Sequence, residues 1–304
     1  MSDAFYASVQ FFIGTLSELL ILFVLISMLV YQLQDRFPAQ RIQALLAGGK
    51  GYFTAAALGA ITPFCSCSTL PMLVGMLRAN AAFGPVMTFL LTSPLLNPIL
   101  VALLFSVFGA KLTLLYATGV LSIAVLSGLL LSQLGFSRYV RLPAAEQSCC
   151  NSSQTTVAIK YWSWQYWSHL WLRAIKDTRS FLPHLILGVL AGAVIHGYVP
   201  ADFFAGLSGT NSLYLIPLAA LIGIPLYVRA SSMIPLALSL VGKGMSYGSV
   251  MALTIGGAGA SLPELIILKK IFQWPLLLAF IGVVLVTACS TGIAIDLLLP
   301  VRSL

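Results

Sequence analysis

Charged residues are scarce in this sequence. Of its 304 residues only 8% are charged, whereas 59% are hydrophobic; a soluble domain carries about 25% charged residues. So few polar side chains cannot cover a surface that faces water. The composition therefore excludes a soluble globular domain, a disordered chain and a nucleic-acid-binding module, and it indicates an integral membrane protein.

The sequence also lacks the signatures of secreted proteins and of enzymes. Its five cysteines include a Cys-x-Cys pair and the adjacent Cys149 and Cys150, which is not the spaced framework of a disulfide scaffold. The N-terminal residues have no basic region followed by a cleavage site, so we expect the first apolar segment to be retained. No Walker motif is present. We expect free thiols, no bound cofactor and no enzyme activity.

What the sequence does have is long apolar runs, which predict an all-α fold. Residues 11–33, 111–134, 181–199 and 275–299 each have about the 20 residues that a helix needs to cross a bilayer. The stretches between them are interrupted by Pro, Gly and hydroxyl residues. These breaks are TPFCSCSTLP (62–71), TSPLLNP (92–98), GIPLYVRASSMIP (223–235) and GGAGASLPE (256–264).

The two halves of the chain resemble each other. The segment LPMLVGMLRANAAFGPVMTFLL (70–91) is similar to IPLALSLVGKGMSYGSVMALTI (234–255), and Pro71 matches Pro235. An internal duplication explains this pattern. We therefore expect a first transmembrane repeat at 1–135, a polar, basic cytoplasmic linker with an amphipathic segment at 136–179, and a second transmembrane repeat at 180–304.

Basic loops predict how the chain crosses the membrane. If the loop after residue 33 and the linker are both cytoplasmic, as their Lys and Arg indicate, an even number of crossings separates them. One of the three apparent segments between them is then a re-entrant broken hairpin, best placed at 52–77. Each repeat would make about three crossings plus one re-entrant hairpin, and the whole chain would have roughly 8–10 hydrophobic segments. The second repeat would be inverted, and both termini would lie outside.

The breaks also predict the solute site, because non-helical backbone at membrane depth must be buried in protein or line a cavity. The alternative is that Pro and Gly only kink the helices and that the hydroxyls cap freed carbonyls. The solute-site candidates are Cys65, Ser66, Cys67, Ser68, Thr69, Ser93, Asn97, Arg229, Ser231, Ser232 and Ser261.

Two kinds of side chain among the candidates carry specific chemistry. Cys65 and Cys67 could both bind one soft centre such as trivalent arsenic, although a buried Cys is also a common small hydrophobe. Ionisable residues within a bilayer are costly and imply pairing or use. We expect Glu264 and Glu18 to couple protons, and Arg229 to bind an anion or to neutralise Glu264.

Four motifs in order resemble one known family. TPFCSCSTLPMLVG (62–75), GPVMTFLLTSPLLNP (84–98), GIPLYVRASSMIP (223–235) and SLPELIILKKIF (261–272) are similar to signature segments of the ArsP-like (YraQ-type) predicted permeases. The resemblance implies an inner-membrane permease, and in the arsenical-exporting members thiols near the Cys-x-Cys are thought to bind trivalent arsenic. The chain departs from the family at 225–229, where PLYVR replaces PLYSN.

Three functions follow from these observations. The first is a secondary permease of the bacterial inner membrane that exports a thiophilic solute such as a trivalent organoarsenical, coupled to protons. The second is a transporter of a small anion or sulfur-containing solute bound at Arg229. The third is a membrane thiol oxidoreductase that uses Cys65 and Cys67. The expected partners are a small solute and the lipid bilayer, with a homodimer left open and no nucleic acid.

Overall fold

The computed structural model describes residues 48–62, 66–141, 212–226 and 245–299 without interruption, and single residues within 10–46, 164–186 and 237–242. The described part is helical, apart from an isolated bridge between Val140 and Phe272, so the expected all-α fold is confirmed for it. The helices are α3 (Lys50–Ile61), α4 (Ser66–Arg78), α5 (Phe83–Leu95), α6 (Pro98–Gln133), the short 3-10 helix η1 (Phe136–Tyr139), α9 (Ser212–Leu226), α11 (Tyr247–Gly259), α12 (Leu262–Leu268) and α13 (Trp274–Leu298).

By length and composition alone, three described stretches qualify as membrane spans: Pro98–Gln133, which is interrupted at Gly109, Tyr247–Leu268, which comprises α11 and α12, and Trp274–Leu298. The last one confirms the span expected at 275–299. With 25 residues, α13 reaches about 38 Å along its axis, more than the roughly 30 Å of a hydrocarbon core. By contrast, α3 and α4 have 12 and 13 residues and reach only about 18 to 20 Å, so neither crosses by itself.

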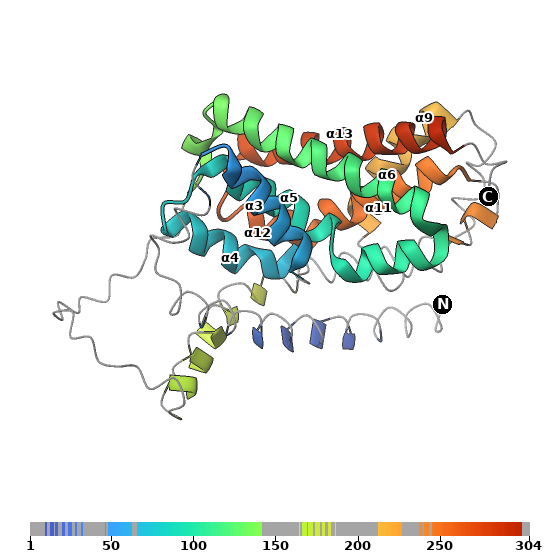
Figure 1. Cartoon of the computed structure of the whole chain (residues 1–304). Coiled ribbons are helices and arrows are strands. Elements are labelled where there is room, and N and C mark those ends of the chain that lie inside the picture. The colour runs from blue at the N-terminus through green and yellow to red at the C-terminus, as the bar shows by residue number, and fades with distance from the viewer. Residues whose placement is uncertain are drawn as a thin grey trace.

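Two of the predicted breaks lie within the described residues, and both are found. The first separates α5 from α6, where Leu96 and Asn97 leave the helical conformation. The second separates α11 from α12 at Ala260 and Ser261. A further break at Gly109 was not predicted. Its φ of 78° and ψ of 175° are accessible to glycine because it has no Cβ, and Figure 1 shows α6 doubling back there.

The long helices pack in antiparallel directions. The second arm of α6, residues 110–133, runs opposite to α5, because Tyr116 and Ala124 of α6 hydrogen-bond to Leu95 and Thr88 of α5 in reverse order. α6 and α13 lie side by side in Figure 1.

Contacts at both ends show that α6 and α13 are antiparallel too. Gly119 faces Thr291, and Val140, after the end of α6, pairs with Phe272, before the start of α13.

The same close contacts occur in both halves of the chain. A Cβ added at Gly128 would lie 2.8 Å from the carbonyl oxygen of Gly84, and one added at Gly292 would lie 2.8 Å from that of Gly248. Gly248 follows Gly84 by 164 positions, and Gly292 follows Gly128 by 164 positions. Small residues let membrane helices approach this closely.

A second pair of glycines repeats the pattern at the same separation. Gly59 of α3 packs against the backbone at Phe89 and Ser93 of α5, and Gly223 of α9 packs against the backbone at Leu253 and Gly257 of α11. The helix pairs α3–α5 and α9–α11 therefore pack in equivalent ways.

Candidate functional site

The ends of the two broken helices meet inside the protein. A Cβ on Gly259, the last residue of α11, would lie 3.2 Å from a methyl of Leu95, the last residue of α5. Leu95 is buried, with 1% of its surface exposed. The two interruptions predicted from the sequence, far apart along the chain, are therefore brought together in the core.

A polar residue within each break directly precedes the helix that follows it. Asn97 is the N-cap of α6, and its Oδ1 accepts a hydrogen bond from the backbone N–H of Ile99 at 3.0 Å. Ser261 is the N-cap of α12 but makes no such side-chain cap. Asn97 therefore fits the alternative in which a polar residue at a break caps a helix end, whereas the side chain of Ser261 does not.

Two hydroxyl groups next to the breaks are buried without a hydrogen-bond partner in the described part of the chain. They are Ser93 Oγ in the last turn of α5 and Ser261 Oγ before α12. Their residues are 0% and 1% exposed. Buried hydroxyls are normally hydrogen-bonded, and leaving one unsatisfied costs about 1 to 3 kcal/mol. Each hydroxyl therefore keeps unused hydrogen-bonding capacity beside a break.

Glu264 is fully buried in the first turn of α12. α12 packs against α4, the helix that begins with the Cys-x-Cys segment. Thr69 of α4 is buried as well. The fold therefore packs α12, which carries the buried acidic residue of the second half, against α4 of the first half.

Several predicted site residues lie at the edge of the described structure or beyond it. Ser66, Cys67 and Ser68 belong to the first turn of α4, and only their backbone is described. The remaining candidates, Glu18, Cys65, Arg229, Ser231 and Ser232, lie outside the described residues, so their part in the site stays a prediction.

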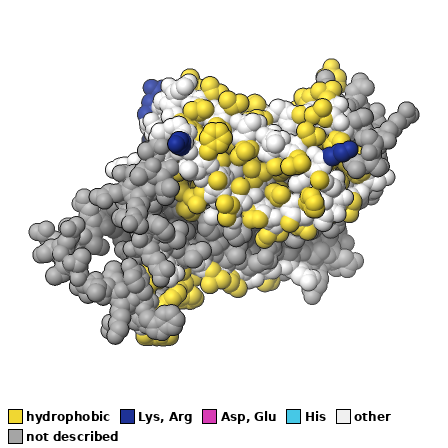
Figure 2. All heavy atoms as spheres, in the orientation of Figure 1, with side chains coloured by type: hydrophobic (Ala, Val, Ile, Leu, Met, Phe, Trp, Pro, Cys, Tyr) yellow, Lys and Arg dark blue, Asp and Glu magenta, His cyan; other side chains and the backbone are white. Residues whose placement is uncertain are grey.

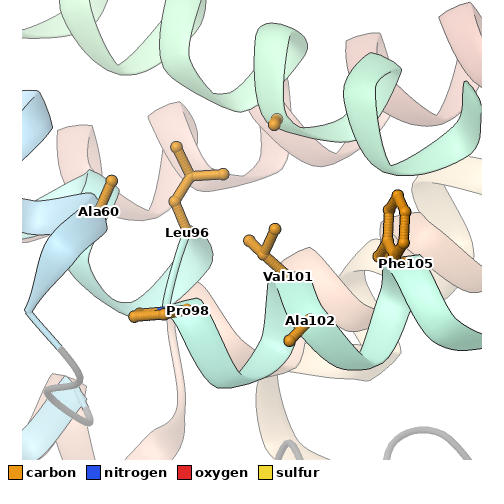
Figure 3. Close-up of a pocket in the computed structure, with 7 residues that line it drawn as sticks. Ala60, Leu96, Pro98, Val101, Ala102 and Phe105 are labelled. Atoms are coloured by element: carbon orange, nitrogen blue, oxygen red, sulfur yellow. The ribbon is translucent and has the colours of Figure 1, made fainter. Parts of the chain in front are cut away.

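An apolar pocket adjoins the break between α5 and α6. Its volume is about 520 Å³, and Figure 3 shows it between the end of α3 and the two arms of α6. No lining side chain carries a polar group, so the pocket suits a hydrocarbon group rather than an ion. Its lining residues are Ala60, Leu96, Pro98, Val101, Ala102, Phe105 and Ala117.

Sequence reasoning missed two polar contacts. Tyr116 of α6 is fully buried, and its hydroxyl donates a hydrogen bond to the carbonyl oxygen of Leu95 at 2.9 Å. Asp296 Oδ1 accepts a hydrogen bond from the N–H of Gly248 at 2.6 Å, in the first turn of α11. Both contacts had a signal in the sequence, namely a polar side chain within an apolar span. Such a side chain needs a hydrogen-bond partner there.

Comparison with known proteins identifies the family. The model of a family described as predicted permeases, of the ArsP type, matches residues 5–297. The chain belongs to this family. Together with the apolar helices, this membership indicates a multi-pass membrane transporter rather than an enzyme. The earlier resemblance is thereby confirmed.

Three relatives share between 22% and 25% identity with the chain. The UPF0718 protein MJ0584 of Methanocaldococcus jannaschii is 22% identical over 79% of this chain and 80% of its own length. A Streptococcus mutans protein, provisionally named a two-component membrane permease complex subunit, is 24% identical over 82% and 78%. The UPF0718 protein YraQ of Escherichia coli is 25% identical over 68% and 57%. No solved structure matches the chain significantly.

The hydrogen bond from Tyr116 predicts a measurable contribution to the site. Replacing Tyr116 with Phe leaves the buried carbonyl of Leu95 without this donor. Phe is the residue found 164 positions later, at position 280 of α13. We expect Tyr116→Phe to lower the free energy of unfolding by about 1 to 3 kcal/mol, measured as a lower thermal midpoint in detergent. Tyr214→Phe is the control because Tyr214 is 76% exposed. Equal midpoints for the two variants would contradict the prediction.

Proposed function

We propose that this protein is a secondary permease that carries a small solute by alternating access, with its solute site where the two broken helices meet. The observation that carries this proposal is the contact between the ends of α5 and α11, at Leu95 and Gly259. Secondary transporters bind their substrates near the bilayer midplane, at helices that are interrupted there. The buried hydroxyls of Ser93 and Ser261 lie beside these ends and support the same location.

We further propose that the chain is built from two inverted repeats. Equivalent glycine contacts 164 positions apart support two similar units. The chain directions of α6 and α13 support the opposite orientation of the two units. These helices occupy corresponding places in the two halves, and they run antiparallel to each other. A pair of inverted units around one site allows the site to open alternately to either side of the membrane.

The inverted arrangement predicts where the chain ends lie. Reporters of cellular compartment fused to the N-terminus and the C-terminus should both be found outside the cytoplasm, because each repeat then makes an odd number of crossings. A reporter in the 136–179 linker should be cytoplasmic and serves as the internal control. Termini on opposite sides of the membrane would refute the inverted arrangement.

The proposed solute is a thiophilic species such as a trivalent organoarsenical, exported across the bacterial inner membrane. Cys65 and Cys67 flank the start of α4, and thiolates prefer soft centres of this kind. The contact of α4 with α12 supports placing this segment beside the meeting breaks. The apolar pocket at Leu96 and Phe105 suits the carbon substituent of such a molecule.

Substitution of the thiols tests the substrate. Cys65→Ser and Cys67→Ser should each weaken the apparent affinity for a trivalent arsenical by about tenfold or more, equivalent to about 1.4 kcal/mol, measured by stabilisation of the purified protein. Cys289→Ser is the matched control, since Cys289 is a free, half-buried thiol of α13. Equal affinity in all variants would remove the thiols from the site, and binding of small anions instead would favour the Arg229 alternative.

We propose that Glu264 carries the coupling proton. A fully buried carboxyl group on the helix beyond a break can exchange a proton when the cavity opens to water. Glu264→Gln should keep folded protein in the membrane and abolish the dependence of flux on an imposed pH gradient in proteoliposomes. Asp296→Asn is the control: it changes the other described carboxylate, whose Oδ1 caps α11, and should keep that dependence. Unchanged, pH-driven flux in Glu264→Gln would exclude the carboxylate from coupling.

A further inference from the structure

Two loops that are distant in the sequence are joined at one end of the molecule. The first consists of η1 and the two residues that follow it (136–141), and the second connects α12 to α13 (269–273). The N–H of Arg141 donates to the carbonyl oxygen of Ile271 at 2.6 Å, and the N–H of Gln273 donates to that of Tyr139 at 3.0 Å. Backbone hydrogen bonds therefore fix the separation of the two loops without help from their side chains.

Both joined loops are basic. Arg138, Arg141 and Lys269 are exposed, and Lys270 is half-buried. Partial burial lowers the pKa of Lys270, because a charged ammonium group loses hydration there. Figure 2 shows Lys and Arg side chains at the end of the molecule where α6 finishes.

No described acidic residue belongs to either of these loops. The described part of the chain contains two acidic residues: Glu264 is buried within α12, and Asp296 lies toward the other end of α13. The exposed cations Arg138, Arg141 and Lys269 are carried on two loops that backbone hydrogen bonds hold together, so they repel one another. An anion that contacts both loops would relieve this repulsion.

Aromatic rings place these cations at the depth of lipid headgroups. The guanidinium of Arg138 lies 4.7 Å from the ring centroid of Tyr139, and Nζ of Lys269 lies 4.7 Å from that of Trp274. Trp274 begins the span α13 and is 60% exposed. Exposed Trp and Tyr at the end of a span are typical of the membrane–water interface, where phosphate groups of lipids are concentrated.

We propose that the joined loops, through the exposed Arg138, Arg141 and Lys269, bind the phosphate of an anionic phospholipid headgroup. Basic clusters next to membrane helices attract anionic lipids, and here one headgroup can contact both loops because the bridge between Val140 and Phe272 holds them together. A bound lipid would also restrain the end of α12, since Lys269 directly follows Leu268. This site is separate from the proposed solute site and does not depend on the transported solute.

The test compares lipids on the purified full-length protein in a neutral detergent. Phosphatidylglycerol should raise the thermal midpoint at low concentration, whereas phosphatidylcholine and inorganic phosphate should not. The double variant Arg138→Gln/Lys269→Gln should weaken the apparent affinity for phosphatidylglycerol by about 25-fold, or about fivefold for each charge removed. The charge-preserving variant Arg138→Lys/Lys269→Arg should bind like the wild type.

Lys111→Gln is the matched control, because Lys111 is exposed at the start of the second arm of α6, away from the joined loops. It should leave the affinity unchanged. The proposal is overturned if the double variant titrates like the wild type, if Lys111→Gln weakens binding as much, or if phosphatidylcholine stabilises the protein equally. Equal stabilisation by inorganic phosphate would show a free-anion site and overturn the assignment to lipid.

Discussion

A helix that is interrupted within a bilayer must bury the peptide groups that the interruption frees, because no water is available in the hydrocarbon to bind them. Here α5 and α11 both stop in the core, and they stop against each other. Around the first stop, Tyr116 binds the carbonyl of Leu95 and Asn97 binds the N–H of Ile99. The arrangement of the surrounding helices follows from the need to cover these two ends.

Glycine residues allow the surrounding helices to approach closely enough to cover these helix ends. Gly59, Gly128, Gly223 and Gly292 stand where another backbone would meet a Cβ atom within 3.3 Å. In lipid, where apolar side chains gain little by leaving a similarly apolar solvent, helix association relies on such close van der Waals packing. The same glycines therefore stabilise the fold, and Gly59 lies against the backbone of Ser93 at the end of α5.

The helix breaks and the last membrane span could be predicted from local sequence. Pro, Gly and hydroxyl residues at 92–98 and 256–264 marked both described breaks, since each signal acts on its own stretch of backbone. The last span was predicted to within one residue at each end. By contrast, the reversal at Gly109 depends on one φ angle that many glycines could adopt. Other features depend on which helices become neighbours, and local sequence signals do not specify that. They are the hydrogen bonds of Tyr116 and Asp296 and the joining of the two basic loops.

The regular separation of 164 positions has a consequence for how the two halves can diverge. Where backbone meets backbone, as at Gly59 and Gly223, a larger side chain is excluded in either half. Positions beside the breaks differ between the halves: Asn97 corresponds to Ser261, and Leu100 corresponds to Glu264. The two halves therefore differ chemically at the proposed solute site, where Glu264 is acidic and its counterpart Leu100 is aliphatic. A solute bound at the proposed site would meet different chemistry from each half and would have one preferred orientation.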